Sequence, residues 1–212
     1  MISAVVPVKT LAASKSRLLP ECARSDVERL ALAMMADVIE ALRGVPALRR
    51  VVVVTPDAAV ARAAEAAGAD ALLRSDPGLN PSVEAASAEV ALQPEDGVLV
   101  VLGDVAAAAP EDLATLLDAV GTRGVALAPS SDGGTAALVR VPFDVIPARF
   151  GPESAKRHRE EAERAHVPCH ELRLPSLAID VDTGEDVEAI LRIATLGRRT
   201  REALEALGVA PG

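Results

Sequence analysis

The sequence predicts an α/β fold, in one domain over residues 1–212, with helices on both faces of a mainly parallel sheet. Short apolar runs alternate with helical patterns over the first 130 residues, which is typical of parallel strands joined by crossover helices. Half of the residues are hydrophobic and 1% are aromatic, so we expect a sizeable core built from Val, Leu, Ile and Ala.

In the first half of the chain, strands are expected at residues 2–6, 50–55, 71–73 and 97–102. The last run is fully apolar, which predicts a central strand. Ser25 and Glu28 fit a capping box that would start a helix ending before Gly44. Two more helices are expected at about residues 56–68 and 80–92.

In the second half, Pro110 suits the first turn of a helix. Strands are expected at residues 124–128, 136–141 and 169–174, with a helix at about 153–165. Thr183 is expected to cap a helix with apolar residues at helical spacing, and a last amphipathic helix covers about 199–207.

Composition excludes several classes of protein. A net charge of −9 and the absence of Trp and Tyr argue against nucleic-acid binding. The longest apolar run, residues 98–109, contains Asp104 and is too short to span a bilayer. Cys22 and Cys169 have no metal-type spacing, and residues 1–20 do not resemble a signal peptide. We therefore expect a soluble cytoplasmic protein.

A basic loop follows the first strand and carries Lys9, Lys15 and Arg17. The chain has only three lysines, and two of them lie in this loop. A lysine ammonium is a compact charge that suits a phosphate oxygen, and phosphate is often held where a strand opens into a loop. A solvated basic loop is the alternative.

Three carboxylates each lie at an apolar run. Asp104 follows the expected central strand, and Asp180 and Asp182 flank Val181. In an extended segment, Asp180 and Asp182 would share one face, where a cation such as Mg²⁺ would relieve their repulsion. Alternatively, Asp104 is a turn or capping residue, Asp182 caps the following helix, and Asp180 pairs with an arginine.

Two further segments could bind an anion. In the turn at residues 132–135, glycine N–H groups and the Thr135 hydroxyl could donate, although a plain hairpin turn explains the pattern almost as well. Ser154 and the first N–H groups of the next helix could hold a carboxylate or phosphate, or Ser154 could be an ordinary cap. His158, one turn further on, faces either the same site or solvent. Dinucleotide and P-loop glycine motifs are absent from the sequence.

Together these segments resemble one family, over about residues 3–190: the 2-phospho-L-lactate / phosphoenolpyruvate guanylyltransferases of deazaflavin coenzyme F-420 biosynthesis. The resemblance is carried by seven segments in order: 7–9 (Pro-Val-Lys), 14–18 (Ser-Lys-Ser-Arg-Leu), 78–80 (Gly-Leu-Asn), 103–104 (Gly-Asp), 132–135 (Asp-Gly-Gly-Thr), 150–158 (Phe-Gly-x-x-Ser-x-x-x-His) and 180–186 (Asp-Val-Asp-Thr-x-x-Asp). It implies a three-layer α/β/α sandwich with a mainly parallel mixed sheet, like that of nucleotide-diphospho-sugar transferases.

The resemblance also implies an activity. GTP and a phosphorylated three-carbon acid, phosphoenolpyruvate or 2-phospho-L-lactate, would bind with Mg²⁺, and the acid's phosphate would displace pyrophosphate from GTP. The implied roles are as follows: Asp104, Asp180 and Asp182 hold the metal; Lys15 bridges phosphates and, with Asp104, is catalytic; Pro7, Val8 and Asn80 border the nucleotide beside Lys9 and Arg17; Thr135, Gly151 and Ser154 grip the acid.

Two alternatives stay open. Ala106 and Ala136 stand where the family usually has proline and asparagine, which motivates a non-catalytic nucleotide- or phosphate-binding protein on the same fold. A nucleotidyltransferase for another phosphorylated acid or sugar is the second. The expected partners are GTP and the small acid, without nucleic acid or membrane, in a monomer or homodimer.

Overall fold

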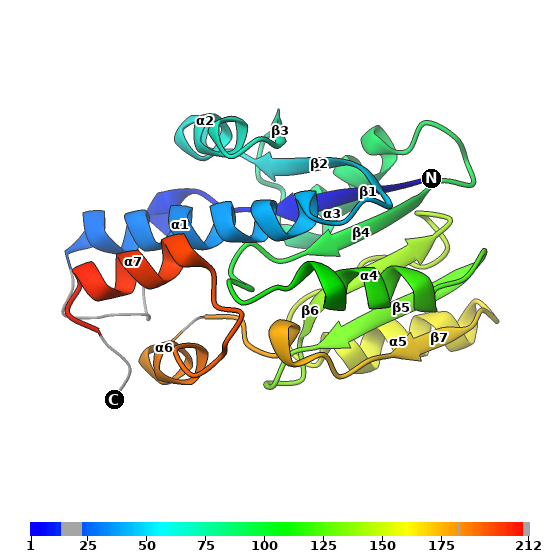
Figure 1. Ribbon diagram of the computed structural model, residues 1–212. Coiled ribbons are helices and arrows are strands. Elements are labelled where there is room, and N and C mark those ends of the chain that lie inside the picture. Colours follow the sequence, from blue (N-terminus) through cyan, green and yellow to red (C-terminus); the bar gives the residue numbers. More distant parts are fainter. Residues whose placement is uncertain (14–22, 182, 210–212) are drawn as a thin grey trace.

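The computed structural model describes residues 1–13, 23–181 and 183–209. In this part of the chain, seven strands form one sheet in the order β3-β2-β1-β4-β6-β5-β7 (Figure 1). Strand β6 runs antiparallel to β4 and β5, and the other neighbouring strands are parallel. The sheet is therefore mixed and mainly parallel, and the apolar strand β4 is central, as predicted. The strands are β1 (Ile2–Pro7), β2 (Leu48–Thr55), β3 (Asp70–Leu73), β4 (Gly97–Val101), β5 (Gly124–Pro129), β6 (Thr135–Val141) and β7 (Cys169–Glu171).

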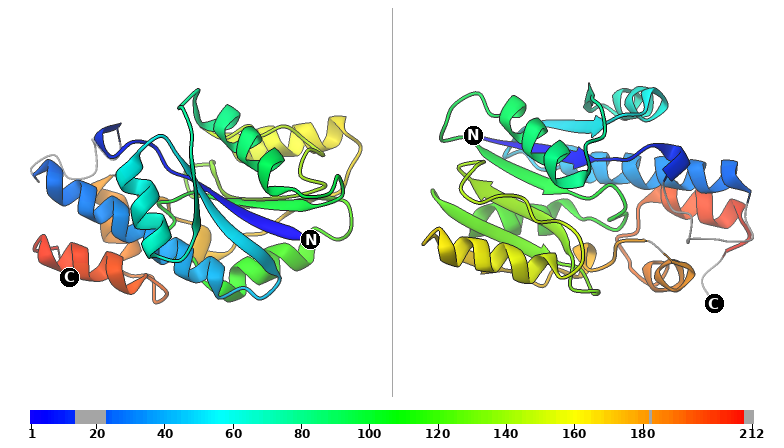
Figure 2. Two further views of the ribbon diagram at one scale, coloured as in Figure 1. Left: turned by 90° about the horizontal axis from the view of Figure 1, so that it is seen from above. Right: turned by 180° about the vertical axis from the view of Figure 1, so that it is seen from behind.

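Helices cover both faces of this sheet and complete the predicted three layers. One face packs against α1 (Arg24–Arg43), α2 (Ala58–Ala66) and α4 (Pro110–Ala119). The other face packs against α3 (Leu79–Val90) and α5 (Ser154–Arg164) (Figure 2). Both interfaces consist almost entirely of aliphatic side chains, whose burial is the main stabilising contribution.

A third apolar cluster lies beyond the sheet, where α6 (Gly184–Ile190) and α7 (Arg198–Ala206) pack with α1. Asp37 of α1 accepts hydrogen bonds from the backbone nitrogen and hydroxyl of Thr200, both at 2.7 Å, which ties the start of α7 to α1. The expected cap of α6 is confirmed, because Thr183 and Asp186 form a capping box. Among the described residues, we find no helix long and apolar enough to cross a membrane.

Two local expectations are wrong. Ser25 does not start α1, which begins at Arg24 with Ala23 as its N-cap, and Glu28 pairs with Arg24 at 3.0 Å instead of completing a capping box. The last strand ends at Glu171 and does not reach residue 174. Pro175 begins a short 3-10 helix, Pro175–Leu177, in which it takes a first-turn position.

The carboxyl ends of β1 and β4 lie side by side at one edge of the sheet. The chain turns from β1 toward β2 on one side, while β4 lies on the other, so this edge is a topological switch point. Because β6 is reversed, its first residue, Thr135, also lies at this edge, and the next residue, Ala136, accepts a hydrogen bond from Leu102 N at 3.1 Å. Ligands of open α/β sheets bind at such an edge.

Candidate active site at the carboxyl edge of the sheet

The loops after β1 and β4 meet closely at Gly103. A Cβ at Gly103 would lie 3.0 Å from the Val8 side chain, so glycine permits this close approach. Pro7 and Val8 are half-buried here, whereas Lys9 is exposed. The structure thus brings the predicted nucleotide-bordering residues Pro7 and Val8 next to the segment that carries Asp104.

The segments that carry Asp104 and Asp180 are joined by a backbone hydrogen bond. Val181 N donates to Asp104 O at 3.3 Å, and Val181 itself is buried in the third apolar cluster with Ala106 and Ala107. Both aspartates are half-buried. The cap of the next helix is Thr183 and not Asp182, so the capping alternative for Asp182 is wrong.

The third predicted metal ligand, Asp182, lies outside the described residues, as do Lys15 and Arg17 of the basic loop. Within the described part, no group of three or more His, Cys, Asp or Glu is placed to hold a metal ion. The predicted set of Asp104, Asp180 and Asp182 therefore stays a prediction, of which the structure describes two members.

Thr135, Ser154 and His158 form a buried polar cluster beside this edge. Ser154 Oγ lies 3.0 Å from Thr135 Oγ1, which also lies 3.1 Å from His158 Nδ1. The interpretation of Ser154 as an ordinary cap is wrong, because the N-cap is Glu153 and the Ser154 hydroxyl reaches across to β6 instead. The solvated interpretation of His158 is also wrong, since its exposed fraction is 0%.

His158 is held as a neutral ring. Burial, with the nearby guanidinium groups of Arg140 and Arg157, lowers the pKa of His158 to about 3. Its Nε2 accepts a hydrogen bond from Arg149 N at 2.9 Å, and Phe150 packs edge-on against the ring with centroids 5.1 Å apart. The ring is therefore fixed in orientation as well as in charge.

The glycine turn between β5 and β6 uses its own N–H groups. Gly134 N donates to Asp132 Oδ1 at 2.8 Å, and Gly133 N donates to Ser130 O at 3.1 Å. This arrangement fits the hairpin interpretation better than anion binding by these two groups. Ser131 N donates to Ala178 O at 2.8 Å, so the turn supports the segment that leads to Asp180.

Asn80 joins α3 to the segment that carries Gly151. Its Nδ2 donates to Phe150 O at 3.1 Å, and its Oδ1 accepts from Phe150 N at 2.7 Å. Gly151 follows at φ +119°, a conformation that favours glycine. Both polar atoms of the Asn80 amide are thus engaged with the protein, and this bridge over 70 residues was not foreseen from the sequence.

Two other supporting contacts also escaped sequence reasoning. Arg140, fully buried in β6, donates to Glu84 at 2.9 Å, to Ser87 at 3.0 Å and to Ile146 O at 2.8 Å. The signal was an isolated arginine in an apolar strand. Asp57 accepts from Leu11 N at 3.0 Å, and this hydrogen bond lowers the pKa of Asp57. It anchors the first part of the basic loop to the start of α2.

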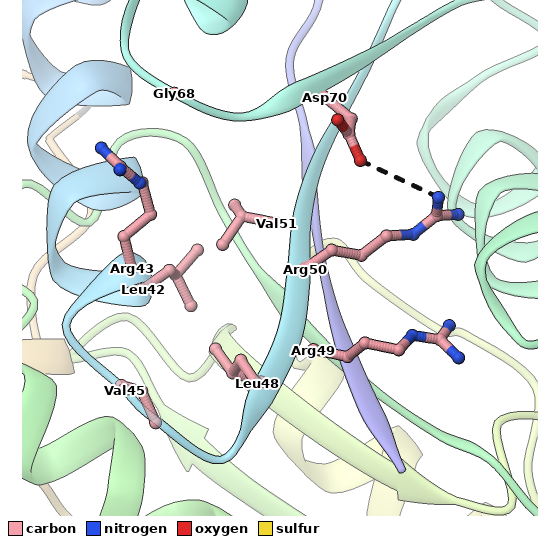
Figure 3. A pocket seen from close by; sticks show the side chains of 9 residues that line it. All are labelled: Leu42, Arg43, Val45, Leu48, Arg49, Arg50, Val51, Gly68 and Asp70. Carbon is pink, nitrogen blue, oxygen red and sulfur yellow. Dashed lines mark ion pairs between the residues drawn. The ribbon is translucent and has the colours of Figure 1, made fainter.

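A hollow of about 270 Å³ lies at the opposite, amino edge of the sheet (Figure 3). A β-bulge there sets Arg49 and Arg50 both opposite Ser3, and Figure 3 shows the two side chains projecting the same way. Arg49 donates to Ser3 Oγ at 2.9 Å, and Arg50 pairs with Asp70 at 3.8 Å. Both arginines therefore bind groups of the protein, and we do not assign the reaction to this hollow.

Comparison with solved structures identifies the fold. The chain has the fold of nucleotidyltransferases: it aligns with a TM-score of 0.67 and 20% identity to a nucleotidyl transferase from Methanothermobacter thermautotroptrophicus, over 90% of this chain and 95% of that one. A crystal structure from Desulfovibrio desulfuricans G20, assigned to the nucleotide-diphospho-sugar transferases, aligns with a TM-score of 0.76 at 18% identity, over 97% and 96%.

The family follows from the sequence comparisons. The family model described as "Guanylyl transferase CofC like" matches residues 2–211, so the chain belongs to this family. A phosphoenolpyruvate guanylyltransferase of Sphaerobacter thermophilus is 35% identical over 94% of this chain and 97% of its own. A 3-phospho-D-glycerate guanylyltransferase of Phenylobacterium zucineum is 38% identical, over 98% and 97%.

Proposed function

We propose that this protein transfers GMP from GTP to the phosphate of a small phosphorylated three-carbon acid and releases pyrophosphate, as a step of coenzyme F-420 biosynthesis. The observation that carries the proposal is the hydrogen bond from Val181 N to Asp104 O, which joins the segments of Asp104 and Asp180 at the switch point of a chain of the guanylyl transferase family. Carboxylates at this position suit the handling of a nucleotide's phosphates through a divalent cation.

The chemistry asks little of a general base. A phosphate oxygen of the acid attacks the α-phosphorus of GTP, a new P–O bond forms, and the bond from the α-phosphorus to the bridging oxygen breaks as pyrophosphate leaves. Because the nucleophile is already anionic, no proton has to be removed first. The protein's contribution is to align the two phosphates and to balance their charge.

Asp104 and Asp180, with Asp182, are the residues that would hold Mg²⁺. Mg²⁺ is typically bound by one or two carboxylates together with substrate phosphates, and the two described aspartates are half-buried on segments that are joined by a backbone hydrogen bond. When bound, the ion would neutralise phosphate charge. Pro7 and Val8 line the edge where the nucleotide is proposed to lie, and Lys15 is proposed to contact its phosphates.

Thr135, Ser154 and Gly151 are proposed to form the acid-binding part of the site, in which Ser154 acts through its hydrogen bond to Thr135. The Ser154–Thr135 contact at 3.0 Å and the Asn80–Phe150 bridge next to Gly151 support this assignment, because they hold the three residues in fixed positions. Asn80 stays proposed to border the nucleotide, and its two hydrogen bonds to Phe150 join that side of the site to Gly151.

A non-catalytic binding protein is the competing function. It was motivated by Ala106 and Ala136, which replace polar or rigid residues of the family. Both alanines are buried within apolar clusters, with exposed fractions of 2% and 0%. Both positions therefore belong to the apolar packing of the protein, and the choice between the two functions depends on the assay.

Pyrophosphate release tests the proposal. The protein is mixed with GTP, Mg²⁺ and one acid at a time: phosphoenolpyruvate, 2-phospho-L-lactate or 3-phosphoglycerate. We expect turnover with at least one acid, no turnover with GTP alone, and loss of turnover when a chelator removes the metal. Nucleotide binding without pyrophosphate release from any acid would favour the non-catalytic alternative.

A further inference from the structure

His158 holds a specific proton, and this follows from its hydrogen bonds. Nε2 lies 2.9 Å from Arg149 N, a backbone group that can only donate, so Nε2 must accept. A neutral imidazole has one donor and one acceptor, so the proton is on Nδ1. The pKa of about 3 supports a neutral ring near pH 7.

The proton on Nδ1 determines how the Thr135 hydroxyl is hydrogen-bonded. With the proton on Nδ1, His158 donates to Thr135 Oγ1 over 3.1 Å, and Ser154 Oγ donates to the same oxygen over 3.0 Å. A hydroxyl oxygen has two acceptor positions and one hydrogen. Because both acceptor positions are filled from inside the protein, the Thr135 hydrogen is not needed by either neighbour and can be donated to a ligand.

We propose that His158 is a positioning residue for the acid: as its Nδ1–H form, it fills an acceptor position of Thr135 and turns the Thr135 hydroxyl toward an anionic oxygen. The inference rests on the proposed function, in which Thr135 contacts the acid. His158 does not touch substrate and exchanges no proton during the reaction. Its role is to make a buried threonine a donor instead of an acceptor.

The surroundings of His158 favour the neutral ring with its proton on Nδ1. The ring is fully buried, packs edge-on against Phe150 with an interplanar angle of 73°, and is bonded at both nitrogens. Arg140, Arg149, Arg157 and Glu161 are its charged neighbours, and the three arginines disfavour a second proton on the ring. If a titrating histidine oriented Thr135, the orientation of the hydroxyl would change with pH. Because this ring stays neutral, the orientation of the Thr135 hydroxyl should not change.

Two variants separate positioning from support of the fold. His158→Asn places an amide N–H near the Nδ1 position, so it can still donate to Thr135 but loses the bond to Arg149 N. His158→Gln can still accept from Arg149 N near the Nε2 position but loses the donor to Thr135. Both lose the ring contact with Phe150, and exposed His170→Asn is the matched control.

We expect His158→Gln to raise the KM and the calorimetric Kd for phosphoenolpyruvate about tenfold, the usual effect of one lost hydrogen bond, while KM for GTP stays within about twofold. His158→Asn should retain acid affinity, even if it melts at a lower temperature. The inference would be overturned if the acid affinities of the two variants followed their melting temperatures, with His158→Asn binding the acid more weakly than His158→Gln. Acid that binds without turnover would instead contradict the proposed reaction alone.

Nitrogen-15 NMR of the histidine rings gives a readout besides activity. The chain has three histidines, and the His158→Asn variant identifies the resonances of His158. We expect a proton on Nδ1, none on Nε2, and no titration between about pH 5 and pH 8, the range in which an ordinary histidine titrates. A proton on Nε2, or titration in this range, would overturn the inference.

Discussion

The two edges of the sheet differ in where their aspartates lie and in the roles that we expect for them. At the amino edge, Asp96 is 3% exposed and is surrounded by donors: the amino group of Met1 at 2.8 Å, Arg49 at 3.3 Å and the backbone nitrogens of Leu92 and Gln93 at 3.0 and 3.2 Å. At the carboxyl edge, Val181 N donates to the backbone oxygen of Asp104 at 3.3 Å, which joins the segments that carry Asp104 and Asp180.

This difference separates stability from function. A carboxylate surrounded by donors stabilises the fold through its charge. At the carboxyl edge, Asp104 and Asp180 are proposed metal ligands, and their charge would act on the substrate's phosphates through a cation. We therefore expect substitutions at the amino edge to change stability with little effect on turnover per folded molecule, and substitutions at the carboxyl edge to do the reverse.

The largest effect is expected for Asp104→Asn. The substitution keeps size and removes the charge, so turnover should fall by about a hundredfold or more, as when one charge-stabilising group is removed. The melting temperature should change little. Pyrophosphate release and a thermal melt measure the two effects, with Asp118→Asn on the exposed side of α4 as the control. Turnover like that of the control would contradict a role in the site.

Lys15→Ala is expected to cause the second-largest loss of turnover, and it tests the proposed site at the carboxyl edge. A contact that strengthens in the transition state lowers turnover more than it weakens GTP binding, so we expect a loss on the order of hundredfold in turnover. Lys15→Arg should restore little, because a planar guanidinium does not replace a compact ammonium.

Lys156→Ala is the matched control for Lys15, since the Lys156 side chain is 63% exposed on α5. Lys9→Ala should have a smaller effect than Lys15→Ala. Steady-state pyrophosphate release and GTP calorimetry make the comparison. If Lys15→Ala turns over as fast as Lys156→Ala, the basic loop is a solvated loop.

Asp96→Asn tests the amino edge. The hydrogen bond from the Met1 ammonium group, together with backbone donors, lowers the pKa of Asp96 from 3.8 to about 2. A lowered pKa stabilises the fold above pH 3.8, and this contribution is lost as the pH falls toward 2. The shift corresponds to about 2 kcal/mol at neutral pH, or a melting temperature lower by about 5 °C.

Denaturation at several pH values checks this prediction. The difference in unfolding free energy between Asp96→Asn and the parent protein should be largest near pH 7 and should shrink below pH 3.8, as the parent aspartate takes up its proton. Turnover per folded molecule should be unchanged. A difference that is constant down to about pH 2 would mean that the charge of Asp96 is not its source.

The smallest effect is expected for Glu40→Gln. Glu40 pairs with Arg199, and the Arg199 contact lowers the pKa of Glu40, but the glutamate side chain is 68% exposed. Exposed pairs are screened by water, so the free energy of unfolding should fall by less than about 0.5 kcal/mol. A larger loss, measured by urea denaturation, would show that an exposed carboxylate can match the buried Asp96.

Much of this arrangement could be predicted from local sequence. Apolar β-branched runs predicted the strands, and Asp104 could be assigned to the functional edge because it follows the most apolar run. The Asn80–Phe150 bridge could not be predicted, since its partner is a backbone group with no sequence signal. The capping box predicted at Ser25 was wrong because the capping rule considers only Ser25 and Glu28. In the structure, Glu28 accepts a hydrogen bond from Arg24 instead.

The polar cluster of Thr135, Ser154 and His158 also could not be predicted from local sequence. Ser154 and His158 lie four residues apart, which places them on one face of a helix. Spacing alone does not say whether that face is buried. The hydroxyl of Thr135, contributed by another element, decides the environment of both residues. Acid binding by this cluster stays a prediction, as do the roles of Lys15, Arg17 and Asp182.

The reversed direction of β6 has a consequence for how acid choice can change. Strands β5 and β6 form a hairpin whose turn lies at the functional edge, while the proposed nucleotide side is built by β1 and β4. Hairpin turns tolerate insertions and substitutions at little cost in stability. Changes in this turn are therefore expected to alter the proposed acid side while β1 and β4 stay unchanged, provided that Ser131 N keeps its hydrogen bond to Ala178 O.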